Sequence, residues 1–240
     1  SGYDFAALDV EAIEGAFEAA VREGRMKRTD FGWGGKPVRG FLKRGGGNAN
    51  HVCGVDGASS EARTQAEFAG RQVMLRIYRF LRAQKGLEAL RIDSMAPEIG
   101  IRETVTIRGE AKVTGADYTS GRLWDDAVCY SFYPIDIHTD EGNGIIGGPL
   151  PAGSLPTIPR GAMIPAGSRN LLVAGRCVAG DREAHSAYRV EASCMAMGQA
   201  AGAMAALSAR QGVDPRDLDL VEVRALLRQH GAIVPGDAPA

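Results

Sequence analysis

His138 is the first of two histidines that stand where acid–base chemistry could be performed. Asp136 precedes it by two positions in a run with strand character, so both side chains would lie on one face of the strand. A carboxylate at that spacing can orient an imidazole or raise its pKa, which makes His138 a candidate general acid or base. The alternative is a histidine at a strand end that bonds only to water or backbone.

His185 is the second candidate, in a short polar segment that also contains Arg182, Glu183, Tyr188 and Arg189. Ionisable and phenolic side chains at this density are more typical of a cofactor or substrate edge than of a core. His185 and Tyr188 are therefore further candidate catalytic residues.

The polar segment lies between a predicted strand and a predicted helix, within residues 170–210. The apolar run 171–174 ends at Gly175 and is typical of a short buried strand. Small residues follow the polar segment, with Gly198 and Gly202 four apart, so a helix there could approach a neighbour or ligand closely. A strand, a glycine turn and a helix N-terminus together are suited to an anionic cofactor.

Periodic apolar positions predict further helices that must position these residues. The predicted ranges are 9–23 with Asp9 as N-cap, 61–90, and 220–230 with Asp219 and Glu222 as a pair resembling a capping box. β-branched residues predict two strands within 99–114, and residues 130–137 are another strand candidate with an edge or bulge at Pro134.

Residues 22–44 carry eight Lys or Arg against two Asp or Glu, a local charge of +6. We expect a solvated loop here, with an anionic substrate or a partner surface as the alternative.

Composition indicates an ordinary soluble globular protein of one large domain or two unequal ones. Apolar residues make up 45% of the 240 residues and charged residues 24%. A formal charge of −1 argues against general nucleic-acid affinity. The four cysteines show no CxxC spacing, which favours a reducing compartment, and we expect a cytoplasmic protein without a membrane-spanning helix.

Other motifs carry less weight. Residues 142–147 match GxGxxG, but Pro149 and Pro151 forbid the helix that a dinucleotide loop needs, so we interpret the match as a turn. His51 and Cys53 have no further ligand at zinc spacing, and we expect no metal site. Cys177 and Cys194 are typical of small apolar fillers, with a redox pair or a ligand contact as the alternative.

Residues 170–202 resemble the C-terminal signature of bacterial FAD-dependent oxidoreductases of the glutathione-reductase-like flavoprotein superfamily. Further marks of that family follow the same order: VDG at 55–57, GRQ at 70–72, GIRE at 100–103, SGR at 120–122, DDA at 125–127 and YPIDIH at 133–138. The resemblance covers nearly the whole chain from about residue 50, and several collinear motifs make it specific.

The resemblance implies a mixed α/β fold, the C-terminal part of a glutathione-reductase-like FAD-binding fold. Residues 1–160 would form a substrate (cap) region with antiparallel strands and a long helix, and residues 161–240 the C-terminal segment of the FAD-binding domain. The family's N-terminal βαβ unit, with its GxGxxG, is not among these residues. We therefore expect a companion chain or an N-terminal half that carries this unit, and we expect the chain to be inactive without it. The chain begins at Ser1 without a methionine, so we also expect that residues upstream were removed.

The resemblance also implies which residues touch the flavin. The expected FAD contacts are Gly175, Arg176, Cys177, Arg189, Val190, Cys194, Met195, Gly198 and Gln199. The PIDIH segment would lie on the substrate side, which makes His138 the best acid–base candidate. Arg160 departs from the family's IPY pattern, and an extra cation there could change substrate preference.

The implied function is hydride transfer between flavin and a small organic substrate, by one chain of a hetero-oligomer or by a fragment of a longer enzyme. The alternative is a non-catalytic structural or binding subunit that kept the fold. The dense polar loop 176–189 favours the enzyme, because a structural relic need not keep such clustering.

Overall fold

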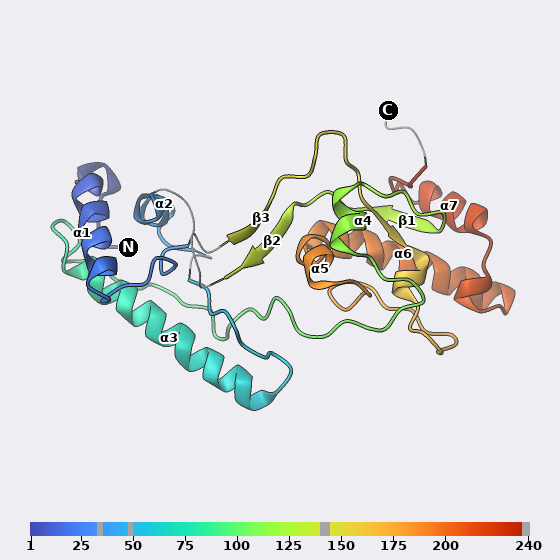
Figure 1. The fold of residues 1–240 in the computed structure, drawn as a ribbon, viewed down its shortest axis with the longest axis horizontal. Helices are drawn as coiled ribbons and strands as arrows, with labels where there is room; N and C mark the ends of the chain where they lie inside the picture. The colour runs from blue at the N-terminus through green and yellow to red at the C-terminus, as the bar shows by residue number, and fades with distance from the viewer. Residues whose placement is uncertain (33–35, 48–49, 140–144, 237–240) are drawn as a thin grey trace. The chain divides into compact units, whose positions relative to one another are not determined.

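The computed structural model describes residues 1–32, 36–47, 50–139 and 145–236 (Figure 1). Its elements are helices and short strands, so the predicted mixed α/β class is confirmed. The finer assignment to a glutathione-reductase-like architecture stays a prediction.

The chain forms two compact units, each with its own hydrophobic core. Unit 1 consists of Ser1–Ile101 with His138–Ile146, and unit 2 of Arg102–Ile137 with Gly147–Ala240. The division is not a single boundary near residue 160, because the chain leaves unit 2 after Ile137 and returns to it at Gly147. The assignment of a cap region to 1–160 and of an FAD segment to 161–240 stays a prediction.

Unit 1 contains the N-terminal helices. These are η1 (Phe5–Ala7), α1 (Val10–Arg22), α2 (Pro37–Arg44) and α3 (Ser60–Arg82). Helix α1 confirms the helix predicted over 9–23, and the Asp9 carboxylate caps it by accepting a hydrogen bond from the amide of Ala12 at 3.0 Å.

Helix α3 is shorter than the helix predicted over 61–90. It ends at Arg82, and a tight turn follows in which the amide of Gln84 donates to Leu81 O at 2.9 Å. Gly86 then has φ +85, so the chain does not continue as an α-helix. The apolar residues beyond this point are buried in turns instead.

Part of the basic segment 22–44, predicted as a solvated loop, forms α2. Pro37 occupies the first turn, where its missing N–H is harmless, and Gly45 ends the helix with φ +70. Val38 and Leu42 are buried in the unit 1 core. The loop prediction was wrong for these residues, because apolar side chains four positions apart give the segment a face to bury.

An aromatic cluster forms the centre of the unit 1 core. Phe17 of α1 is fully buried and lies edge-on to Phe31 and Phe80, with ring centroids 5.2 Å and 6.0 Å away. Phe31 packs in the same way against Phe41 of α2 at 5.2 Å. Edge-to-face rings attract one another beyond the effect of burial, so α1, α2 and α3 are joined at this cluster.

Unit 2 holds the C-terminal helices and one complete sheet. Its elements are α4 (Gly115–Thr119), β1 (Ala127–Tyr130), β4 (Thr157–Pro159), η2 (Arg160–Met163), α5 (Arg182–Tyr188), α6 (Glu191–Gln211), η3 (Pro215–Asp217) and α7 (Leu220–Gln229). Strands β1 and β4 pair antiparallel, with Cys129 opposite Ile158. The other sheet, β2 (Ile135–His138) with β3 (Ile145–Gly148), contains residues of both units.

The strands predicted within residues 99–114 do not form in the described chain. The amide of Ile107 donates to Cys177 O at 2.9 Å and that of Val113 to Ala179 O at 3.2 Å, and regular pairing goes no further than isolated bridges. β-branched residues favour extended backbone, but a strand also needs a continuous ladder with an extended partner. Here the partner segment is a series of turns, so the prediction was wrong.

The strand predicted at 171–174 is also wrong for the described chain. The amide of Val173 donates to Met163 O at 2.8 Å, but no ladder continues from that bond. The candidate strand at 130–137 is divided instead, because β1 and β2 are separated around Pro134, which cannot donate to a ladder.

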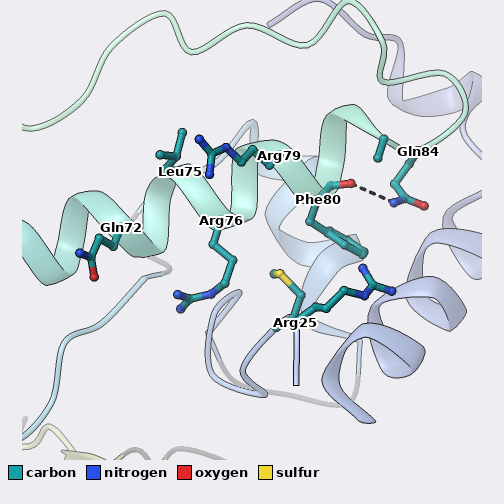
Figure 2. Close-up of a pocket in the computed structure, with 9 residues that line it drawn as sticks. Arg25, Gln72, Leu75, Arg76, Arg79, Phe80 and Gln84 are labelled. Atoms are coloured by element: carbon teal, nitrogen blue, oxygen red, sulfur yellow. Dashed lines mark hydrogen bonds between the residues drawn. The ribbon is translucent and has the colours of Figure 1, made fainter. Parts of the chain in front are cut away.

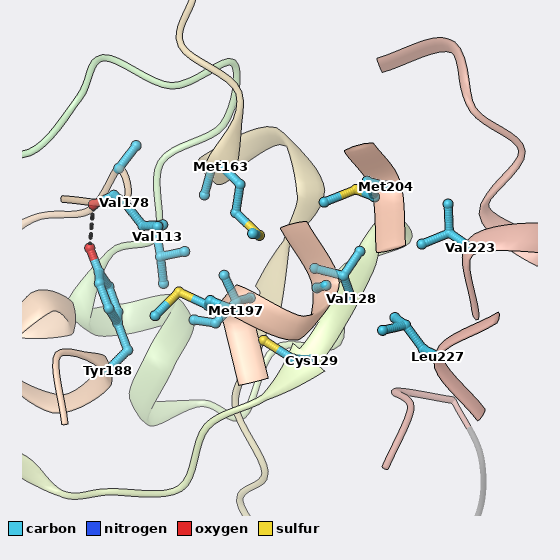
Figure 3. Close-up of a cluster of buried hydrophobic side chains, with 14 of the residues drawn as sticks. Val113, Val128, Cys129, Met163, Val178, Tyr188, Met197, Met204, Val223 and Leu227 are labelled. Atoms are coloured by element: carbon cyan, nitrogen blue, oxygen red, sulfur yellow. Dashed lines mark hydrogen bonds between the residues drawn. The ribbon is translucent and has the colours of Figure 1, made fainter. Parts of the chain in front are cut away.

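The core of unit 2 lies between α6, α7 and β1 (Figure 3). Met197 and Met204 of α6 and Val223 and Leu227 of α7 are buried together with Val128 of β1. Packing along most of its length therefore fixes α6, including the position of its first turn.

Both C-terminal helices confirm their predictions, and α7 ends one residue before the predicted range 220–230. Asp219 caps α7 by accepting a hydrogen bond from the amide of Val221 at 2.9 Å. The predicted capping box is wrong, because the Glu222 carboxylate accepts a hydrogen bond from Gln211 Nε2 at 2.6 Å.

Within the residues that the structure describes, none of the helices combines the length and the apolar character needed to cross a membrane. The cytoplasmic location stays a prediction.

Replacing Phe17 by alanine is expected to destabilise unit 1 by about 3–5 kcal/mol, because it leaves a cavity among the neighbouring rings. Native-state hydrogen exchange of the amides of α1 and α3 measures this change. Phe68→Ala on α3 is the matched control, since Phe68 is 61% exposed and should change stability by less than about 0.5 kcal/mol. Equal effects of the two substitutions would contradict an aromatic core centred on Phe17.

Candidate functional site

A buried arginine lies where α5 meets α6. The Arg189 side chain is 4% exposed, and its Nη1 donates to Glu103 Oε1 at 2.8 Å. Its Nη2 donates to the backbone oxygen of Asp136 at 3.0 Å. The Asp136 carboxylate in turn accepts a hydrogen bond from Arg102 Nη2 at 2.7 Å. We call these four residues, which come from distant parts of the sequence, the Arg189 network.

Helix capping brings Arg189 to this position. Asp181 begins α5, and its carboxylate accepts hydrogen bonds from the amides of Ala184 and Gly115, each at 2.9 Å. Arg189 caps the C-terminal end of α5, and Val190 is the N-cap of α6 directly after it. Two helices therefore meet at one pair of residues, and the Arg189 network anchors that junction.

Electrostatics makes the network interdependent. Burial lowers the pKa of Arg189, since the guanidinium loses hydration, and the nearby charge of Arg102 acts in the same direction. The Glu103 carboxylate opposes both effects and also accepts a hydrogen bond from Arg182 Nε at 3.3 Å. Because an arginine in a protein stays protonated, its buried charge requires this carboxylate.

His185 and Tyr188, two of the predicted catalytic residues, point into unit 2. His185 Nε2 lies 2.7 Å from Arg176 O, and because a carbonyl oxygen only accepts, Nε2 carries the proton. The fully buried Tyr188 donates its hydroxyl to Val178 O at 2.8 Å (Figure 3). Burial lowers the pKa of His185 and raises the pKa of Tyr188, so both are neutral near pH 7. Both side chains hold residues 176–178 against α5, and their catalytic roles stay predictions.

The glycine turn that precedes α5 lies beside the first turns of α6. Gly175 has φ +84, a left-handed backbone that favours glycine, and a Cβ built there would lie 3.9 Å from Cys194 Sγ. The Cys194 thiol donates to Arg189 O at 3.2 Å, and burial raises its pKa although the charge of Arg176 lowers it. Cys177 is exposed on the same turn. The structure thus brings four predicted cofactor contacts together: Gly175, Arg176, Cys177 and Cys194.

The first turn of α6 presents backbone N–H groups that no side chain caps. Val190 is the N-cap and offers no side-chain acceptor. In the described part of the chain, no acceptor is found for the amides of Glu191, Ala192 and Ser193. A helix start of this kind carries partial positive charge and binds anions or carbonyl oxygens. Met195 is 68% exposed in the next turn, so this end of α6 is accessible from outside the chain.

Gly198 and Gln199 lie further along α6. Gln199 Nε2 donates to His230 O at 3.2 Å, so its amide is directed to the end of α7. Gly198 faces open space, since a Cβ built there would meet nothing within 4 Å. The structure therefore does not bring these two predicted contacts to the first turn of α6.

Comparison with known protein families identifies the arrangement. The family model described as FAD dependent oxidoreductase matches residues 4–227. The chain belongs to this family. FAD is the cofactor that membership implies. A search of curated proteins and a search of solved structures each gave no match.

The start of α6 fits this cofactor chemically. FAD contains an anionic pyrophosphate, and helix N–H groups together with the charge of Arg176 favour an anion. Gly175 presents a backbone without a Cβ, which permits close approach. Among the described residues, no group of three or more His, Cys, Asp or Glu could hold a metal ion.

His138, the predicted acid–base residue of this family member, belongs to unit 1. Its ring stacks on that of His51, with centroids 4.5 Å apart and 12° between the ring planes. The Asp136 carboxylate, which the sequence paired with His138, forms an ion pair with Arg102 at 2.7 Å. The acid–base role of His138 stays a prediction.

The sequence predicted no functional role for Glu103 or Arg102, although the GIRE motif at 100–103 contains both. The available signal was a pair of charges within a run of β-branched residues. Nothing in the sequence shows that this pair meets Arg189 and Asp136, because the contacts span 86 and 34 residues.

A buried hydroxyl network was also missed. Ser131 Oγ lies 2.7 Å from the Tyr118 hydroxyl and 2.8 Å from Ser193 Oγ. Burial raises the pKa of Tyr118 to about 12, so the phenol stays protonated. The network ties the first turn of α6 to α4, and lone hydroxyl residues in a sequence give no sign of it.

Two further sequence features are not part of the Arg189 network or of the first turn of α6. Arg160, the departure from the family pattern, donates from Nη1 to Leu218 O at 2.7 Å and so bonds to the segment before α7. The rejected GxGxxG at 142–147 lies partly outside the described residues.

Replacing Glu103 by glutamine is expected to destabilise unit 2 by about 1–3 kcal/mol, because the buried Arg189 loses its carboxylate partner. Urea unfolding measures the change in stability, and hydrogen exchange of the amides of α5 and α6 shows where in the unit it occurs. Asp125→Asn removes one carboxylate at an exposed position and is the matched control. Equal stability of the two variants would show that Arg189 does not depend on Glu103.

Proposed function

We propose that this chain closes over the flavin of an FAD-dependent oxidoreductase that transfers a hydride between FAD and a small organic substrate. The observation that carries the proposal is the uncapped first turn of α6 beside the left-handed Gly175, in a chain whose family implies FAD. FAD, when bound, supplies the hydride acceptor or donor.

The capping pattern of the chain supports a ligand at this helix start. Helices α1, α3, α4, α5 and α7 have side-chain caps from Asp, Ser or Thr, and α2, which starts at Lys36 without such a cap, has Pro37 in its first turn. Helix α6, with 21 residues, starts at Val190 instead, and valine is among the poorest N-caps. A helix that served packing alone would gain stability from a polar residue there, so we infer that its N–H groups serve a bound anion.

Each residue near the start of α6 has a defined task in this proposal. The N–H groups of Glu191, Ala192 and Ser193 hold negative charge on the cofactor, where the helix dipole contributes about 0.3–1 kcal/mol. Arg189 fixes the turn through its buried network, in which Glu103 neutralises its charge. Arg176, next to the glycine turn, supplies a cation for the cofactor.

The ADP-binding part of FAD is held, in this proposal, by another chain or by a segment outside these residues. A Rossmann unit needs parallel strands joined by a crossover helix, and the sheets of the described residues are two-stranded, with β1 and β4 antiparallel. Gly198 and Gly202 leave an exposed part of α6 without side chains that a second backbone can approach closely.

A non-catalytic subunit is the second candidate. It is favoured by His185 and Tyr188, because both side chains bond to backbone oxygens inside unit 2. Against it stands the open helix start, which a purely structural α6 does not need.

Production of this chain together with a companion that contains a GxGxxG Rossmann unit tests the proposal. The complex should be yellow and release FAD on denaturation. A colourless complex would overturn the proposal, and a yellow complex that no substrate or reductant can reduce would favour the non-catalytic subunit.

Gly198→Leu in that complex is expected to lower FAD occupancy about tenfold, equivalent to roughly 1.4 kcal/mol of binding free energy. The leucine fits this chain itself, because open space surrounds Gly198. Gly15→Leu, in equally open space on α1, is the control and should leave occupancy unchanged. Normal occupancy in Gly198→Leu would contradict a close approach of α6 to cofactor or companion.

His138→Ala is expected to slow substrate-dependent flavin reduction by about 10²–10⁴-fold, the usual contribution of a general acid or base, while FAD stays bound. Stopped-flow absorbance of the flavin measures the rate. The control is His230→Ala, at an exposed histidine that follows α7. In this variant the substrate should reduce the flavin at the normal rate. Unchanged reduction in His138→Ala would refute its acid–base role.

A further inference from the structure

Unit 1 contains a cavity of about 500 Å³ that the flavin proposal does not use (Figure 2). Helix α3 forms one wall with Leu75, Arg76, Arg79 and Phe80, and the segment after α1 contributes Arg25. Figure 2 shows Arg76 and Phe80 pointing from α3 toward the segment that carries Arg25, while Arg79 lies beside Leu75. The volume is within the range of about 300–1,000 Å³ that small-molecule sites have.

The three arginines of the cavity differ in how they are bound. Arg76 Nε donates to Asp30 Oδ2 at 2.8 Å, and the carboxylate of Asp30 is 2% exposed, so this guanidinium is fixed. Arg25 pairs with the exposed Glu23 at 2.6 Å, a contact of little strength in water. Arg79 has no hydrogen-bond acceptor or ion-pair partner among the described residues.

The cavity is therefore positively charged. Three guanidinium groups are matched by two carboxylates, which leaves a net charge of +1 from these five side chains. The basic segment 22–44 supplies Arg25, so the structure connects the charge excess seen in the sequence to a concave surface. This favours an anionic ligand, the alternative that the sequence left beside a solvated loop.

Apolar side chains complete the lining. Leu75 is 44% exposed, Phe80 is 8% exposed, and Met26 is buried beside them. Phe80 and Met26 form the floor as part of the core, so Leu75 supplies the apolar surface that is still exposed. An inorganic ion would gain nothing from Leu75, whereas the apolar part of an organic molecule would bury its surface. The combination of free cation and apolar wall matches a small organic anion.

We propose that this cavity binds a small organic anion, one carboxylate or phosphate group attached to an apolar body. Arg79 holds the anionic group by charge-assisted hydrogen bonds, and Arg25 adds to the positive charge of the cavity. Leu75, which lies beside Arg79, contacts the apolar body. Arg76, fixed by Asp30, shapes the site and adds its charge. The site lies within unit 1 and does not depend on flavin binding.

Isothermal titration of the full chain tests the proposal with four probes: phenyl phosphate, benzoate, inorganic phosphate and phenol. One or both aromatic anions should bind saturably at one site, at least tenfold tighter than inorganic phosphate or phenol. The tighter of the two identifies the anionic group as phosphate or carboxylate. Absence of saturable binding by both aromatic anions would overturn the proposal.

Arg79→Gln should weaken binding of the tighter probe about tenfold. Arg22→Gln is the matched control, because it removes an exposed arginine of α1 that does not line the cavity. The control should change binding less than twofold. An equal loss of affinity in both variants would show that the probe responds to the overall positive charge and not to Arg79. Arg79 is exposed, so circular dichroism should show both variants folded.

Leu75→Ala separates the two parts of the ligand. The substitution should weaken binding of the aromatic anion and leave binding of inorganic phosphate unchanged, because only the apolar contact is removed. If the aromatic anion binds equally well before and after this change, Leu75 does not contact the ligand.

Discussion

The candidate flavin site depends on one buried guanidinium. Arg189 is withdrawn from water at the residue where α5 ends, and removing a charge from water costs several kcal/mol unless partners replace the solvent. Glu103 and the backbone of Asp136 are those partners. Because Val190 follows directly as the N-cap of α6, whatever holds Arg189 also holds the start of that helix.

Short-range contacts then set the surroundings of the helix start. His185 and Tyr188 lie on α5 and bond to Arg176 O and Val178 O, so the turn after Gly175 is attached to the same helix that ends at the buried arginine. Both groups are neutral, which suits hydrogen bonds to carbonyl oxygens inside a protein and adds no second buried charge. The site is thus held by a charged anchor and by neutral bonds that follow from it.

The sequence predicted what local periodicity determines. Helices α1 and α7 were placed within a residue or two, and Asp9 and Asp219 were recognised as caps, because spacing and capping act over one or two turns. A helix was expected where α6 lies, but without its bounds. The strands expected at 99–114 and 171–174 failed, since a ladder depends on a partner that the local sequence does not contain. The same limit hid the role of Glu103, whose partner lies 86 residues away. The cofactor came from motif resemblance, and the family match supports it.

Two kinds of arginine can be distinguished by what surrounds them. Arg189 is buried and has a carboxylate within 2.8 Å, so its charge is already committed to holding the fold. Arg79 is exposed, lacks a protein partner in the described chain and lies next to an exposed leucine. A ligand can gain from a cation only where no protein group has already neutralised it. Arg189 therefore belongs to the frame of the candidate flavin site, whereas Arg79, beside the exposed Leu75, is the cation to which we assign the anion.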